Sequence, residues 1–130
     1  MTRAHFLTFV SLVALLVGAV ALLFPRALLE SKGVAVTDGV VVWTREVGVL
    51  IACQGVLAWL ARHEPDSRSL RAILVASALT QLGLFPIELV ALGAGTLTRL
   101  GGVVPNSILH VVLALAFAVY ATRVRVDPVR

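Results

Sequence analysis

Four long apolar stretches, separated by short polar segments, dominate the hydrophobic pattern of the chain. Within each stretch the apolar residues run continuously and do not alternate with polar ones, which is typical of membrane-spanning helices rather than barrel strands. A helix needs about 20 residues to cross the hydrocarbon layer, and the stretches are close to this length. The pattern therefore predicts helices at about residues 6–24, 39–61, 70–92 and 106–121.

Residues that cap or interrupt helices mark the expected helix ends. Pro25 closes the first helix, and Thr37 and Asp38 are suitable N-cap residues for the second. We expect the fourth helix to start directly after Pro105, because a missing N–H costs nothing at a helix start. Short connections make successive helices antiparallel. We therefore expect a single transmembrane domain over residues 1–130, an all-α bundle of four helices running up-down-up-down.

The composition supports a membrane protein and excludes other classes. Hydrophobic residues make up 59% of the chain and charged residues 14%, against roughly 25% charged in soluble domains. The net charge is +4, but the basic residues flank apolar segments and form no stripe with interleaved aromatics. We therefore expect membrane lipid, and no nucleic acid, as a partner.

The distribution of basic residues predicts the orientation, because Lys and Arg favour the cytoplasmic side of a membrane. Seven basic residues fall on one side of the four spans and three on the other. This bias places both termini in the cytoplasm, with the chain as a multi-pass protein of the inner membrane. The seven are Arg3, Arg62, Arg68, Arg71, Arg123, Arg125 and Arg130, and the three are Arg26, Lys32 and Arg99.

The first apolar stretch has an alternative interpretation as a cleaved signal peptide. Residues 19–21 form an acceptable cleavage pattern, but the apolar run is longer than a signal sequence needs and continues past this site. The stretch also has a row of small residues at helical spacing, which lets membrane helices approach closely. The row consists of Ser11, Ala14, Gly18 and Ala21.

Ionisable residues inside the predicted spans are the best functional signal, because each one costs a few kcal/mol in a bilayer and needs a partner or a purpose. Arg45 and Glu46 lie in the second helix, Glu88 in the third and His110 in the fourth. Alternating helix directions bring all four to a similar depth near the outer face. Three helices thus contribute to one polar layer.

Helical spacing extends this layer. Gln81 and Glu88 are seven residues apart and share a face of the third helix, and Asn106 and His110 are four apart on the fourth. Pro86 loosens the helix beside Glu88. The predicted ligand-binding residues are Arg45, Glu46, Gln81, Glu88, Asn106 and His110.

Three functions fit these residues. The first is an outer-side polar pocket that binds a small or lipophilic ligand, with Glu46 and His110 in its wall and Trp43 and Phe85 near its rim. The second is a membrane enzyme in which Glu46, Glu88 and His110 transfer protons to a lipophilic substrate. The third is an accessory subunit, in a homo-oligomer or a larger membrane complex, whose polar layer is structural.

In the structural interpretation, Arg45 pairs with Glu88, and Glu46 pairs with His110. Arg45 would repel a cation beside Glu46, so we expect no metal. A bis-histidine haem needs a second histidine at the depth of His110, and the sequence has none there. We therefore expect no cofactor.

Three short motifs mark the ends of the predicted helices: Arg45-Glu46-x-Gly48, Trp59-Leu60-Ala61-Arg62 and Asn106-x-x-x-His110. With these motifs the chain resembles the small four-helix bacterial membrane proteins grouped around the DoxX-like families. The resemblance implies a compact helical bundle, sometimes associated with quinone-linked redox proteins, and transfers no catalytic residue. Small multidrug transporters share the length, but they carry a carboxylate in their first helix that this chain lacks.

Overall fold

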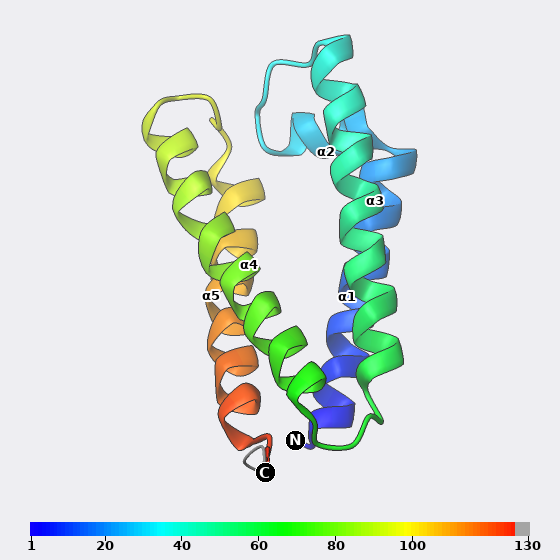
Figure 1. Ribbon diagram of the computed structural model, residues 1–130. Coiled ribbons are helices and arrows are strands. Elements are labelled where there is room, and N and C mark those ends of the chain that lie inside the picture. The colour runs from blue at the N-terminus through cyan, green and yellow to red at the C-terminus, as the bar shows by residue number, and fades with distance from the viewer. Residues whose placement is uncertain (127–130) are drawn as a thin grey trace. The chain divides into compact units, whose positions relative to one another are not determined.

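Five α-helices make up most of the computed structural model, which describes residues 1–126 (Figure 1). All of them except α2 are long and apolar enough to cross a membrane, which confirms the all-α class and the four predicted spans. The helices form two compact units, Met1–His63 and Glu64–Arg130, and each is described by itself. The bounds are α1 Arg3–Leu23, α2 Pro25–Ser31, α3 Asp38–Ala61, α4 Arg68–Gly93 and α5 Leu100–Arg123.

The end of α1 and the start of α2 are both set by Pro25. The residue before a proline avoids helical angles, and Phe24 has φ −127° and ψ 47°. The first helix accordingly ends at Leu23. Proline is well suited to the first helical position, so Pro25 begins α2. The hydrophobic pattern predicts only a connection between the first two long helices here, because a helix of two turns is too short to show a clear apolar period.

Side-chain caps and glycines terminate several helices. Thr37, predicted as an N-cap, accepts a hydrogen bond from the Val40 N–H at 3.3 Å at the start of α3. Gly33 follows α2 with φ 72°, and Gly95 follows α4 with φ 73°. In both turns the residue after the glycine donates its N–H to a carbonyl five residues back, the pattern that satisfies exposed helix carbonyls.

The fourth long helix begins earlier than predicted. It starts at Leu100, and Pro105 lies inside it rather than ahead of it. Proline lacks the N–H that would bond to the carbonyl of Gly101, but a bilayer penalises irregular backbone more strongly than one missing hydrogen bond. Val103, between the two, is 1% exposed, so the first turns of α5 belong to the packed helix pair.

In the first unit, α1 and α3 run antiparallel and touch along small residues. A Cβ added to Gly48 would lie 3.0 Å from Ala21 Cβ and 3.1 Å from the Gly18 carbonyl oxygen. A Cβ on Gly55 would lie 3.1 Å from the Ser11 carbonyl oxygen. The small residues of α1 therefore form a packing face, as predicted, and only small residues on α3 permit this backbone approach.

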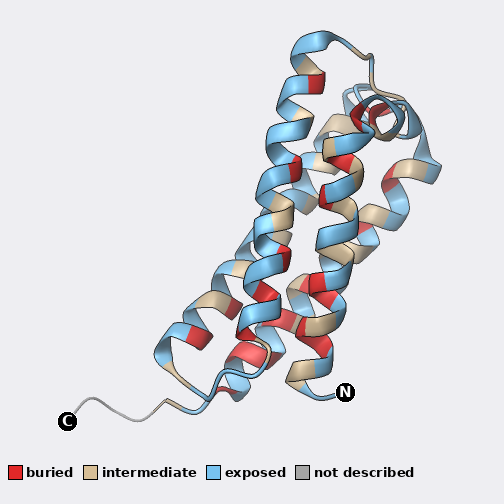
Figure 2. Cartoon of the chain, turned by 90° about the vertical axis from the view of Figure 1, so that its right-hand side faces the viewer, coloured by how far each residue is buried: buried red, intermediate tan, exposed pale blue. Residues whose placement is uncertain are grey.

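Most apolar side chains of the long helices remain exposed, and buried residues form narrow stripes along them (Figure 2). Trp43 is 69% exposed, Leu50 66% and Val90 71%. Soluble proteins rarely expose apolar patches of this extent. A lipid environment accounts for these surfaces and agrees with the four candidate spans.

Candidate functional site

Four of the six predicted site residues come together in the second unit. Gln81 and Glu88 lie on α4, and Asn106 and His110 lie on α5. The two helices run antiparallel, so each residue near the end of α4 faces one near the start of α5. All four side chains are partly buried. The helical spacing that paired these residues on their own helices thus predicted the faces that meet.

A chain of short hydrogen bonds links these four residues to Ser107. Asn106 Nδ2 donates to Glu88 Oε1 at 2.6 Å, and Ser107 Oγ donates to Glu88 Oε2 at 2.7 Å. Asn106 Nδ2 also lies 3.0 Å from His110 Nε2. At the far end, His110 Nδ1 lies 2.6 Å from Gln81 Oε1. We call these five residues the polar cluster.

The orientation of the Asn106 amide determines which role each ring nitrogen of His110 takes in the polar cluster. The Asn106 amide nitrogen has two protons, one for Glu88 and one for His110, so His110 Nε2 is the acceptor in that contact. The remaining proton then lies on His110 Nδ1, where it is donated to the Gln81 carbonyl oxygen. Glu88 accepts two hydrogen bonds in this arrangement, one at each carboxylate oxygen.

Ser107 is a site residue that the sequence did not reveal. It is 7% exposed, and its hydroxyl is held by Glu88. Serine is common in membrane helices, where it usually bonds to its own backbone, so its identity gave no signal. Its position next to Asn106 was the one indication. Adjacent residues differ by about 100° around a helix, so the side chains of Asn106 and Ser107 can both reach the carboxylate of Glu88.

An apolar groove lies between α4 and α5 and reaches the polar cluster at Ser107. Its volume is about 390 Å³, within the range of roughly 300–1,000 Å³ found for ligand sites. Of the residues predicted to surround a pocket, Phe85 lines this groove, whereas Trp43, Glu46 and His110 do not. The lining residues are Phe85, Leu89, Leu92, Val103, Val104, Ser107, Ile108, Val111 and Val112.

The other two predicted residues, Arg45 and Glu46, lie on α3 in the first unit, and both are exposed. The neighbouring Thr44 hydroxyl bonds back to the Val40 carbonyl at 2.8 Å. The proposed pairing of Arg45 with Glu88 stays a prediction, since it joins residues of different units. No three His, Cys, Asp or Glu side chains within residues 1–126 gather as a metal site would require.

Comparisons with protein-family models, with curated proteins and with solved structures gave no match to this chain. The resemblance to DoxX-like proteins therefore stays a prediction. The arguments for function rest on the geometry of the polar cluster and of the groove beside it.

Proposed function

We propose that this chain is a multi-pass membrane protein that binds a lipophilic molecule between α4 and α5. The apolar part of the ligand occupies the groove, and its polar head contacts the polar cluster. The proposal rests on the position of Ser107. It lines the groove, and its hydroxyl is also bonded to the carboxylate of Glu88. The accessible wall of the groove is apolar, so in this proposal the head group reaches past that wall to the Ser107 hydroxyl, which is fixed by Glu88.

The chemistry of Ser107 and Glu88 selects the head group. The Ser107 proton is engaged with Glu88, so its oxygen can only accept a further hydrogen bond. The Glu88 oxygens are acceptors as well, and their negative charge opposes an anion. The groove therefore favours a ligand whose head donates a hydrogen bond, such as a long-chain alcohol or amine, over a fatty acid.

We propose that the protein lies in a bacterial inner membrane with both termini in the cytoplasm, as the basic residues favour. The polar cluster is then near the outer face, and the chain can serve as a ligand-binding accessory subunit. The enzyme alternative gains less support. Both ring nitrogens of His110 and both oxygens of Glu88 are already engaged within the polar cluster, so neither is directed at a substrate.

Fluorescence quenching by brominated probes tests the proposal. The reporter is Phe85→Trp in a variant whose native tryptophans, Trp43 and Trp59, are replaced by Phe. A dibrominated long-chain alcohol should quench this reporter saturably. The dibrominated alkane, which has no head group, and the dibrominated fatty acid should both bind more weakly. Leu115→Trp is the matched control, because Leu115 is 63% exposed on α5 and does not line the groove.

Ser107→Ala separates ligand binding from a purely structural role. It leaves the groove apolar and removes the acceptor, so the alcohol should lose affinity while the alkane is unchanged. Quenching that grows linearly with probe, and equally for Phe85→Trp and Leu115→Trp, would mean simple partition into detergent. The polar cluster would then serve only to hold α4 against α5.

A further inference from the structure

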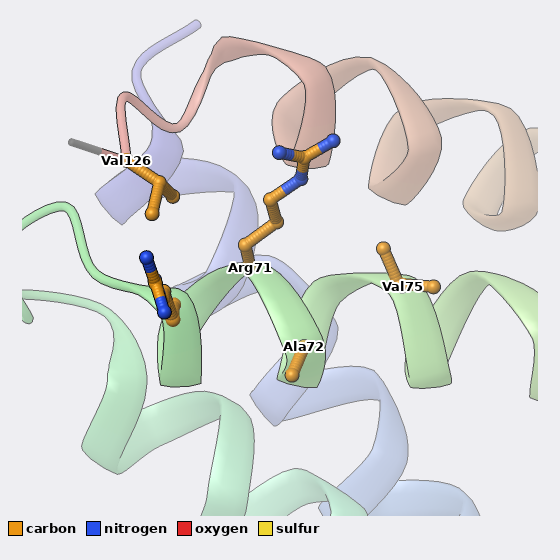
Figure 3. A pocket seen from close by; sticks show the side chains of 5 residues that line it. Arg71, Ala72, Val75 and Val126 are labelled. Atoms are coloured by element: carbon orange, nitrogen blue, oxygen red, sulfur yellow. The ribbon is translucent and has the colours of Figure 1, made fainter. Parts of the chain in front are cut away.

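A second cavity lies at the opposite end of the second unit, where α4 begins and α5 ends. Its volume is about 420 Å³, and it is lined by Arg68, Arg71, Ala72, Val75 and Val126. Figure 3 shows Arg71 extending from the α4 backbone, with Val126 across the cavity from this helix. Two arginines and three apolar residues thus share one concave surface, and none of its lining residues is acidic.

The positions of these residues follow from local structure. Ser67 caps α4 by accepting a hydrogen bond from the Leu70 N–H at 3.1 Å, which makes Arg68 the first helical residue. Arg71 follows three residues later and therefore lies on the same face. On the other side, Asp66 accepts a hydrogen bond from the Arg125 N–H at 2.9 Å. This bond ties the segment after α5 to the start of α4 and places Val126 over the cavity.

The cavity has the electrostatics of an anion site. Arg68 and Arg71 concentrate two positive charges on one helix face, and each guanidinium has five N–H donors. The Arg71 guanidinium has no hydrogen-bond or ion-pair partner in the part of the chain that the structure describes. Guanidinium groups bind phosphate oxygens in pairs of parallel hydrogen bonds, so arginine is well suited to this ligand.

The apolar wall indicates which phosphate fits. Ala72 and Val75 continue along α4 from the arginines into the apolar part of the helix. Outside the cavity, at the same end of α5, the Arg123 guanidinium lies 5.8 Å from the centre of the Tyr120 ring, and such basic and aromatic residues are typical of the membrane–water boundary. A molecule bound here has its charge at the boundary and its tail along Ala72 and Val75.

We propose that this cavity binds an anionic phospholipid, with its phosphate between Arg68 and Arg71 and the start of an acyl chain on Ala72 and Val75. The site is independent of the groove proposed above, because the two share no lining residue.

Native mass spectrometry of the full chain in detergent tests the site, with phosphatidylglycerol as the probe. Arg71→Gln and Arg68→Gln should each lower the apparent affinity about fivefold, from the usual contribution of one basic residue near anionic lipid. Ala72→Trp keeps both charges but fills the cavity, so it should lower the affinity as well. Ala72 is exposed, and this variant should fold normally by circular dichroism.

Arg123→Gln is the control, because it removes one arginine at the same end of the unit but outside the cavity. Its affinity should change less than twofold. An equal loss in Arg123→Gln and Arg71→Gln, or no loss in Ala72→Trp, would show only general attraction and overturn the site. Equal binding of phosphatidylcholine would remove the preference for anionic lipid. Equal binding of glycerol phosphate would mean that the apolar wall has no role, and would also overturn the proposal.

Discussion

The close contact between α1 and α3 predicts a specific effect of adding one methyl group at Gly18. A Cβ at this position would lie 2.9 Å from the Ala52 backbone nitrogen and 2.9 Å from the Gly48 carbonyl oxygen. Ordinary contacts begin near 3.4 Å, so the two helices must separate by about 0.5 Å. Both obstacles are backbone atoms of a regular helix and cannot rotate away as a side chain would.

The size of the effect follows from two opposing terms. Overpacking of this kind costs about 1–3 kcal/mol, and a gap of about 0.5 Å forfeits roughly a quarter of the attraction between each pair of facing atoms. Replacing glycine by alanine in a helix returns up to about 1 kcal/mol. We therefore expect Gly18→Ala to lower the free energy of unfolding by about 1–2 kcal/mol.

Gly39→Ala is the matched control. Nothing lies within 4 Å of a Cβ at Gly39 on α3, so this variant should be as stable as the native chain or slightly more stable. Titration with dodecyl sulfate, followed by tryptophan fluorescence, measures both variants, because the two tryptophans of the chain lie in α3. If Gly18→Ala proves as stable as Gly39→Ala, the helices are farther apart than described and the packing argument fails.

Three further predictions concern orientation, the polar cluster and the surface. Reporter fusions at the C-terminus and within residues 62–69 should both indicate the cytoplasm, and a periplasmic signal from either would reverse the proposed orientation. Asn106→Leu should lower the free energy of unfolding in dodecyl sulfate by about 1 kcal/mol, since it removes two hydrogen bonds of the polar cluster, of about 0.6 kcal/mol each. Ile108→Ala should change it less, because Ile108 is exposed. Arg26→Ala should change the free energy of unfolding by less than about 1 kcal/mol, because the 2.7 Å ion pair between Arg26 and Asp38 is exposed. A larger loss would mean that this ion pair holds α2 in place.

The sequence by itself determined the class of the protein and the location of its spans. Hydropathy and length belong to a single segment, so they can be evaluated without knowing what the segment touches. The same holds for helical spacing, which placed Gln81 with Glu88 and Asn106 with His110. A short connection then makes α4 and α5 antiparallel neighbours, which brings the four residues to a similar depth.

Only the tertiary structure decided how α5 is rotated against α4, and that rotation sets which polar groups meet. It directs Ser107 to Glu88 and places the same residue at the edge of an apolar groove, neither of which its residue type indicates. It also decided that Pro105 lies within a helix, because Val103 is buried and the backbone around it must keep its hydrogen bonds inside the helix. Such contacts depend on how two helices pack together, so they cannot be predicted from the residue pattern of either helix alone.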